Sequence, residues 1–218
     1  MKGLFITFEG TEGSGKSTQI SRLAERLRGM GRTLRTFREP GGTPIGEEIR
    51  HTLKHSGQNQ AMQAETELLL MNASRAQLVR EEIRPGLAAG EVVLCDRFYD
   101  STTAYQGYGR QLELKTVKAI IDFAVGETRP DLTLLIVVSH EVSQERLLAR
   151  QSTLPFMRDR IEEADRGFFE RVARGYQAIA AAEPERVKVI QGIGSTEAIE
   201  SEIWKTVEPL LSRTGRAG

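Results

Sequence analysis

Residues 4–17 read LFITFEGTEGSGKS, an apolar run of strand length followed by the pattern G-x-x-x-x-G-K-S. Glycines let the backbone turn tightly and point its N–H groups inward, and a helix that follows presents its positive end to the same point. Lys16 can reach the β- and γ-phosphates of a nucleotide, and the Ser17 hydroxyl can ligate Mg²⁺. The stretch therefore predicts a phosphate-binding loop for a nucleoside triphosphate, set between a strand and a helix.

In the rest of the chain, short apolar runs alternate with longer amphipathic stretches. This alternation is typical of βαβ units and a parallel sheet. Strands are expected at residues 4–9, 33–38, 92–96, 132–138 and 187–191. Helices are expected at residues 16–28, 45–55, 65–88, 113–124, 142–150, 163–182 and 197–211. The predicted fold class is α/β, a three-layer P-loop NTPase fold whose five-stranded parallel sheet is covered by helices on both faces.

Composition limits the classes of partner and compartment. The chain has 218 residues, and its 30 Lys and Arg balance its 30 Asp and Glu, so no overall field would draw it onto nucleic acid or an anionic membrane. The single cysteine, Cys95, excludes an internal disulfide and lies in an apolar run typical of a buried strand. We find no signal peptide and no long apolar run, and we therefore expect a cytoplasmic protein with no nucleic-acid or membrane partner.

Charged residues follow two further strands of the expected sheet. In parallel α/β sheets, ligands bind beyond the carboxyl ends of the strands. The second strand is followed by REPGGTP at residues 38–44, where Pro and paired Gly favour an irregular turn and Arg38 and Glu39 bring charge to the crevice. The third strand ends in Asp96 and Arg97, and a carboxylate at this point suits a Walker-B role in holding Mg²⁺.

The motifs present and absent favour phosphoryl transfer over a nucleotide-operated switch. Neither the N-K-x-D nor the D-x-x-G pattern of GTPases occurs in the sequence. A phosphoryl-transfer enzyme needs cations around two sets of phosphates, and arginines at loop-proximal or helix-end positions could supply them. These arginines are Arg38, Arg50, Arg75, Arg97, Arg150, Arg158 and Arg160. Each alone could equally be a solvated surface residue, so the argument depends on the set.

Four motifs resemble those of bacterial thymidylate kinases, in order and in spacing. They are FEGTEGSGKST at 8–18, REPGGT at 38–43, DRF at 96–98 and AYQG at 104–107. The resemblance covers nearly the whole chain and implies transfer of the ATP γ-phosphoryl group to dTMP, giving dTDP and ADP for dTTP biosynthesis, with Mg²⁺ as the metal. It also implies a homodimer joined through helices on one flank of the sheet. The alternatives are a P-loop kinase for another nucleotide or small molecule, and a nucleotide-binding regulatory module without turnover.

The resemblance further implies one kinase domain over residues 1–212, with a lid at about 150–162 and a flexible tail at 213–218. The residues implied in ATP binding are Gly10, Thr11, Glu12, Gly13, Ser14, Gly15, Lys16, Ser17, Thr18 and Arg150. Those implied in dTMP binding are Glu39, Arg50, Met71, Arg75, Arg97, Thr102, Tyr105 and Gln106. Those implied in catalysis are Glu12, Lys16, Asp96, Arg97, Arg158 and Arg160, and the metal ligands would be Ser17 and Asp96.

Within the implied dTMP pocket, Arg75 and Gln106 would hydrogen-bond the thymine and Thr102 would line the same space. Tyr105 would lie against the ribose C2′, because an apolar ring face rejects a hydroxyl that it cannot hydrogen-bond. The chain departs from the family at Met71, where thymidylate kinases commonly stack a phenylalanine on the base. Met71 could replace part of that stacking or could be an ordinary core residue of its helix.

A second departure lies in the expected lid. Residues 158–162, RDRIE, resemble the family pattern, but the run upstream of them does not. Because the phosphate-binding loop contains no arginine, Arg150, Arg158 or Arg160 would have to neutralise charge at the transferring phosphoryl group. The alternative is a fixed helix-to-helix turn made by Pro155 and Phe156.

Overall fold

A computed structural model describes residues 3–153, 161 and 165–214. Its sheet has five parallel strands in the order β2-β3-β1-β4-β5. The strands are β1 (Leu4–Glu9), β2 (Leu34–Arg38), β3 (Val92–Asp96), β4 (Leu132–Val137) and β5 (Val187–Gln191). Each agrees with its expected range to within one residue at either end. The predicted α/β class and five-stranded parallel sheet are therefore confirmed.

The helices that surround the sheet begin with α1 (Lys16–Gly29), α2 (Pro44–Lys54), a short 3₁₀ turn η1 (Asn59–Ala61) and α3 (Ala64–Leu78). A π-helical segment, η2 (Val79–Ile83), joins α3 to α4 (Arg84–Ala88), so the helix expected at 65–88 is continuous but changes its winding. The later helices are α5 (Tyr99–Thr102), the π-helical η3 (Thr103–Gly109), α6 (Leu114–Val125), α7 (His140–Thr153), α8 (Arg166–Ala182) and α9 (Thr196–Thr214).

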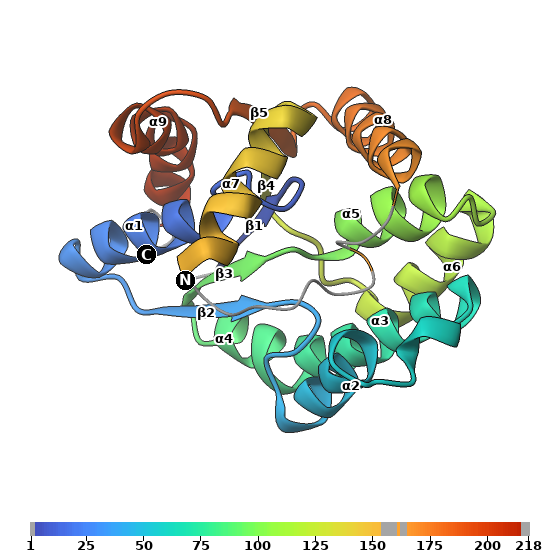
Figure 1. Ribbon diagram of the computed structural model, residues 1–218. Helices are drawn as coiled ribbons and strands as arrows, with labels where there is room; N and C mark the ends of the chain where they lie inside the picture. Colours follow the sequence, from blue (N-terminus) through green and yellow to red (C-terminus); the bar gives the residue numbers. More distant parts are fainter. Residues whose placement is uncertain (1–2, 154–160, 162–164, 215–218) are drawn as a thin grey trace.

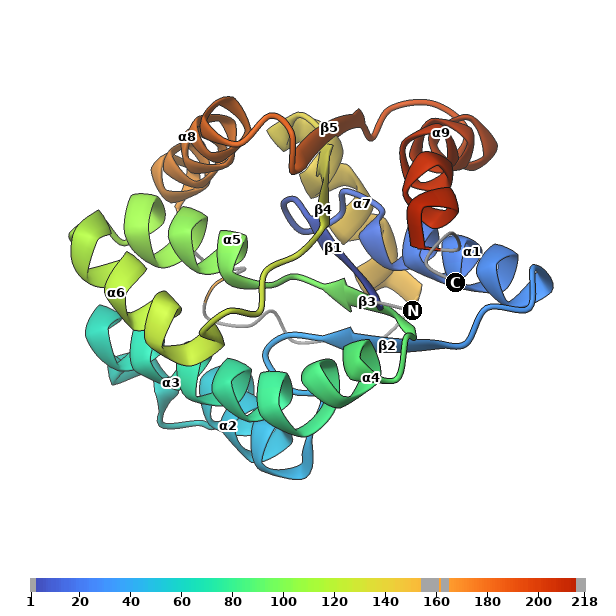
Figure 2. The same ribbon diagram turned by 180° about the vertical axis from the view of Figure 1, so that it is seen from behind.

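Helices cover both faces of the sheet, as Figure 1 shows from one side and Figure 2 from behind. Helices α1 and α9 lie side by side on one face and bury the side chains of Ile6, Phe8 and Leu94. Helices α3, α6 and α8 lie on the other face, where Phe5 and Leu135 are buried. All six residues of β1 are buried, which explains why this central strand reads as a continuous apolar run.

The helical segment α5–η3 was not predicted from the sequence. Its side chains between Ser101 and Gly107 are buried except for the half-buried Thr103, so no polar face alternates with an apolar one. Helical periodicity is visible only where one face meets water. Its glycines, at positions 107 and 109, further reduce its helix propensity. This segment carries three residues expected in the dTMP pocket.

The pairing register of the sheet aligns the carboxyl ends of β1, β2 and β3. Phe8 of β1 and Arg38 of β2 both lie opposite Asp96 of β3. The residues that follow these strands therefore meet at the carboxyl edge of the sheet, as expected. The turn after β2 is irregular as predicted: the Glu39–Pro40 peptide bond is cis, and Gly41 has a φ of 126°.

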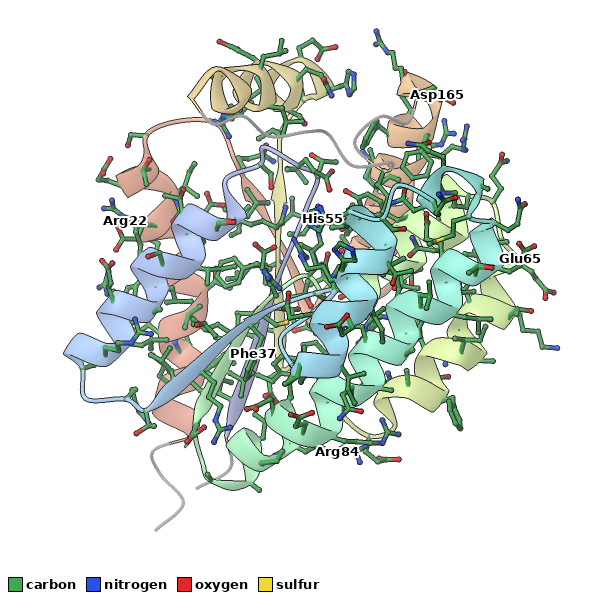
Figure 3. All side chains as sticks on the ribbon, turned by 60° about the horizontal axis from the view of Figure 1, so that its bottom comes forward. Arg22, Phe37, His55, Glu65, Arg84 and Asp165 are labelled. Atoms are coloured by element: carbon green, nitrogen blue, oxygen red, sulfur yellow. The ribbon has the colours of Figure 1, made fainter. Side chains whose placement is uncertain are left out.

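One flank of the molecule is formed by α2, α3 and α6, which Figure 3 shows next to one another. Large apolar side chains on this flank are exposed, above all Phe123 on α6 (83%) and Leu69 on α3 (56%). None of the described helices combines the length and apolar character that a bilayer-spanning segment requires.

Candidate active site

The loop between β1 and α1 has the backbone of a phosphate cradle. Gly10, Gly13 and Gly15 have φ values of 135°, 72° and 98°, a region that residues with a Cβ rarely adopt. The Lys16 ammonium lies across this loop, with Nζ donating to the carbonyl oxygens of Gly10 at 3.0 Å and Thr11 at 2.9 Å. The predicted loop is thus formed, and its N–H groups and lysine lie at the positive end of α1.

Lys16 is buried beside both cations and anions. Burial and the neighbouring Arg97 lower the pKa of Lys16 to about 8, while Asp96 and Glu12 oppose that change. An additional anion near Nζ would favour the protonated form and raise this pKa again. The site is therefore electrostatically suited to a polyphosphate.

Ser17 and Asp96 come together at the mouth of this loop. Ser17 Oγ donates a hydrogen bond to Asp96 Oδ2 at 3.1 Å. Hydroxyl and carboxylate oxygens are the ligands that Mg²⁺ prefers, and Mg²⁺ usually keeps waters and phosphate oxygens in its shell. Within the described part of the chain, no group of three or more Asp, Glu, His or Cys could hold a metal ion. The Ser17–Asp96 pair fits a Mg²⁺ whose further ligands are water and the phosphate oxygens of a bound nucleotide.

Arg97 follows β3 in a left-handed backbone conformation, with a φ of 68°. Its guanidinium donates from Nη2 to Glu12 Oε1 at 2.7 Å, and from Nη1 to Ser101 Oγ at 3.1 Å and to the Tyr176 hydroxyl at 3.2 Å. Such strained conformations persist only where the surroundings fix them, and they cluster at functional sites. Burial would raise the pKa of Glu12, but Arg97 and Lys16 outweigh that effect and lower it.

A buried carboxylate, Glu9, lies behind Arg97. Its Oε1 accepts from the backbone N–H of Phe98 at 2.8 Å, and its Oε2 accepts from Ser101 Oγ at 2.6 Å and the Tyr176 hydroxyl at 2.8 Å. Burial, with a contribution from Asp100, raises the pKa of Glu9. The sequence analysis missed Glu9, Ser101 and Tyr176. A carboxylate at the end of an otherwise apolar strand was a usable signal for Glu9.

A narrow pocket beside Arg97 is walled by α3 and η3. Three residues of α3, Glu67, Met71 and Arg75, are spaced four apart and so lie on one face of the helix. Met71 and Arg75 line the pocket, together with Tyr105 of η3. Met71 is half-buried, lines the pocket and also packs against the core, and its contact with the base stays a prediction.

Arg75 is almost fully buried, and its guanidinium is bound by the protein. Its Nε and Nη2 atoms lie 2.8 and 2.7 Å from Glu39 Oε2. Its Nη1 donates to Asn72 Oδ1 and to Thr102 Oγ1, at 2.9 Å each. Its Nη2 also donates to the Phe98 carbonyl at 3.2 Å. Four of the five N–H groups of the side chain thus donate hydrogen bonds, and Nη2 also forms an ion pair with Glu39. Burial, partly offset by Arg75, raises the pKa of Glu39 to about 7.

Tyr105 and Gln106 are consecutive buried residues of η3. The Tyr105 hydroxyl donates to Glu12 Oε2 at 2.8 Å, and the Arg97 guanidinium lies 5.0 Å from the centre of the Tyr105 ring. Gln106 Nε2 donates to Oε1 of the buried Glu67 at 2.7 Å. Both predicted residues thus line the same pocket as Thr102.

A second pocket adjoins the first on the side of the phosphate-binding loop. It is lined by Gly13, Gly15, Lys16, Ser17, Thr18 and Asp96, together with Arg38, Arg50 and Arg146. The two pockets share Glu12, Glu39, Lys54 and Arg97. The pocket on the phosphate-binding loop and the pocket beside α3 and η3 therefore meet at Arg97.

The predicted arginines have different outcomes. Arg50 Nη1 donates to the Pro40 carbonyl at 2.9 Å on the pocket wall. The side chain of Arg150 and all of Arg158 and Arg160 lie outside the described residues. Arg38 forms a bidentate pair with Glu47 at 2.7 and 3.0 Å, which lowers the pKa of Glu47 to about 2.

Arg146 of α7 was missed from the sequence. Its Nη1 donates to the Gly13 carbonyl of the phosphate-binding loop at 3.2 Å, and its Nη2 donates to the Gly192 carbonyl at 2.9 Å. It precedes Arg150 by one helical turn, so the two positions share a face of α7, and this spacing could have identified Arg146 from the sequence.

Comparisons with known proteins agree with this geometry. The family model for thymidylate kinase matches residues 8–203. The chain is 44% identical to thymidylate kinase of Alcanivorax borkumensis over 210 residues, which cover 96% of this chain and 98% of that protein. It is 46% identical to thymidylate kinase of Geobacter sulfurreducens over 215 residues, which cover 98% and 99% respectively.

A solved structure also has the same fold. The crystal structure of thymidylate kinase from Ehrlichia chaffeensis superposes with a TM-score of 0.75 at 32% sequence identity, covering 95% of this chain and 99% of that one. A match to the family model over most of the chain, with full-length relatives well above 30% identity, settles the assignment. The chain belongs to the thymidylate kinase family.

Proposed function

We propose that the chain transfers the γ-phosphoryl group of ATP to dTMP, giving dTDP and ADP. The observation that carries this proposal is the meeting of two pockets at Glu12 and Arg97, one containing the phosphate-binding loop and the other lined by Tyr105, Arg75 and Gln106. In-line transfer requires the two phosphates to face each other across such a junction. A nucleotide switch or an ATPase would not need the second pocket.

On the donor side, Lys16 and the N–H groups of residues 10–18 bind the β- and γ-phosphates of ATP. Their positive charge stabilises the negative charge that develops on the oxygens of the transferring group. Ser17 and Asp96 would hold Mg²⁺, which when bound neutralises phosphate charge. Arg146 extends the donor site along α7. Arg150 remains in the proposal as an ATP-binding residue on the basis of its sequence position.

On the acceptor side, Arg97 holds the dTMP phosphate, and Glu12 lies between that phosphate and the sugar. Tyr105 packs against the ribose C2′. Gln106, Thr102 and Met71 form the base end of the pocket. Arg75 would contact the base from Nη1 only by exchanging a hydrogen bond, because Nη1 already donates to Asn72 and Thr102. Glu39 and Arg50 close the acceptor side.

The proposed domain organisation is one kinase domain with an arginine-containing lid. Residues 1–212 form a single kinase domain, and residues 150–162 act as its lid, with Arg158 and Arg160 stabilising the transferring phosphoryl group. Two residues of the expected tail at 213–218, Arg213 and Thr214, belong to α9, and residues 215–218 lie outside the described residues.

We also propose a cytoplasmic homodimer formed through the flank of α2, α3 and α6. Exposed Phe123 and Leu69 support this surface, because solvated apolar side chains of this size favour burial against a partner. Light scattering at micromolar concentration should give twice the chain mass of 24.3 kDa. A single-chain mass would contradict the dimer.

The experiment that tests the function is a coupled ADP-release assay with ATP and each common nucleoside monophosphate in turn. The proposal expects dTMP to give the highest kcat/KM of the series. Preference for another monophosphate would favour a P-loop kinase of different specificity. ATP binding without acceptor-dependent ADP release would instead favour a regulatory nucleotide-binding module.

A further inference from the structure

The amide of Gln106 is held in one orientation by a buried carboxylate. Gln106 lies in the acceptor pocket and is 2% exposed. Its Nε2 donates to Glu67 Oε1 at 2.7 Å, and Glu67 is fully buried. Arg110 also donates to Glu67, from Nε to the same Oε1 at 3.2 Å and from Nη2 to Oε2 at 3.1 Å. The guanidinium carbon of Arg110 lies 4.7 Å from the centre of the Phe168 ring, and this contact fixes the position of Arg110.

The chemistry of these groups determines which end of the amide faces Glu67. A carboxylate offers only acceptor oxygens, whereas a glutamine amide has a donor end and an acceptor end. Rotating the amide by half a turn would place Gln106 Oε1 against Glu67 Oε1, leaving two buried acceptors without a donor between them, an arrangement that is costly. Among the described residues, none donates to Gln106 Oε1, so the carbonyl is the end left for a ligand.

We infer that Glu67 is a positioning residue that sets base specificity, by holding the Gln106 amide so that its carbonyl oxygen faces the bound base. An acceptor at this point selects pyrimidines with a ring N–H, thymine and uracil, and rejects the cytosine type, whose ring nitrogen is itself an acceptor. The inference rests on the proposed function.

The other polar groups at this end of the pocket, Arg75 and Thr102, do not make the same distinction. The Thr102 hydroxyl can donate as well as accept, so it can pair with either type of ring nitrogen. Arg75 offers only donors, and carbonyl oxygens that accept from a guanidinium occur on thymine, uracil and cytosine alike. Only an acceptor can therefore distinguish the ring N–H of thymine or uracil from the ring nitrogen of cytosine, and the carbonyl oxygen of Gln106 is that acceptor. Glu67 lies one helical turn before Met71 on the pocket-facing side of α3, so a residue that does not line the pocket controls one that does.

The test is the nearly isosteric substitution Glu67→Gln, with the dissociation constants of dTMP and dCMP measured by calorimetry. The new amide can donate to Gln106 Oε1 as well as accept from Nε2, so both orientations of Gln106 become possible. The ratio of the dCMP to the dTMP dissociation constant should fall by roughly tenfold or more. The reason is that the Gln106 amide can then turn its N–H group toward the acceptor nitrogen of cytosine, which removes the mispairing of two buried acceptors. The matched control is Glu65→Gln, the same chemical change at an exposed position on the same helix (Figure 3), which should leave the ratio unchanged.

A purely structural role for Glu67 would weaken both ligands equally, and an unchanged ratio in Glu67→Gln would overturn the inference. Gln106→Leu provides a second test that does not require Glu67→Gln to fold. It should lower the same ratio, and a ratio equal to that of the unmodified protein would show that the amide does not read the base. Failure of the unmodified protein to phosphorylate dTMP overturns the proposed function and this inference together. Phosphorylation of dTMP with an unchanged ratio in both variants overturns the inference alone.

Discussion

Tyr176→Phe tests whether Arg97 is held in place from behind. The substitution keeps a buried ring and removes one hydroxyl, which contacts Glu9 Oε2 at 2.8 Å, Ser101 Oγ at 3.0 Å and Arg97 Nη1 at 3.2 Å. Loss of a hydrogen bond to a charged group costs about 1.5–3 kcal/mol. If that energy serves to align Arg97 with the acceptor phosphate, kcat/KM for dTMP should fall by roughly tenfold to a hundredfold. The KM for ATP should change little, because the hydrogen-bond partners of the hydroxyl are Glu9, Ser101 and Arg97 rather than residues 10–18 of the phosphate-binding loop.

Initial rates at varied dTMP and saturating ATP measure this effect, and thermal unfolding measures the cost to the fold. The midpoint Tm should fall by roughly 2–4 °C for each kcal/mol of stability lost. Tyr108→Phe is the matched control, because it removes a half-buried tyrosine hydroxyl from the neighbouring η3 outside this network. A lowered Tm with unchanged kcat/KM for dTMP would refute the reasoning and leave Tyr176 as a fold residue only.

Three further predictions concern single residues of the two pockets. Lys16→Ala should lower kcat by at least about 10²-fold, because it removes a preorganised cation from the transferring phosphate. The circular dichroism of the variant should be unchanged, and near-normal turnover would contradict the donor site. Tyr105→Ala should narrow the difference in kcat/KM between the deoxy and ribo forms of thymidine monophosphate, and equal efficiencies in the unmodified enzyme would remove Tyr105 from the sugar site. Glu39 has a pKa raised from 4.5 to about 7, so the folded protein binds its proton more tightly than the unfolded chain does. Its contribution to stability is present below pH 4.5 and is lost as the pH rises through about 7. In urea unfolding, wild-type stability relative to Glu39→Gln should therefore decline over this range, by at most about 1.4 kcal/mol per pH unit, and a constant difference would contradict the shift.

The parts of the fold that the sequence predicts are those with a local signal. Strands β1, β3 and β4 are buried on both faces and so read as apolar runs, whereas β2 and β5 are only partly buried. The ends of all five strands were predicted to within one residue. The phosphate-binding loop was predicted from its glycines, whose positive φ values only that residue adopts easily. The segment α5–η3 was missed because burial on every side removes the helical period.

The parts of the site that the sequence could not supply depend on contacts between distant segments. Tyr176 reaches Arg97 across 79 positions of the chain, and no local pattern marks such a pair. Glu67 resembled any acidic residue of an exposed helix, and only the fold shows that it is buried against Gln106. Arg75 lines the pocket as expected, but nothing in the sequence indicated that its guanidinium also bonds to Glu39 and Thr102, and its contact with the base stays a prediction. Motifs thus indicate which residues surround a ligand better than they indicate what each side chain does.

The most direct measurement of the central claim follows the fate of the phosphoryl group itself. ATP labelled in its γ-phosphoryl group is incubated with the enzyme, Mg²⁺ and dTMP, and the products are separated. The account predicts one labelled dTDP for each ADP formed, with little label in inorganic phosphate and no ADP formation when dTMP is omitted. ADP formation that does not depend on dTMP, or label recovered in inorganic phosphate rather than in dTDP, would contradict it.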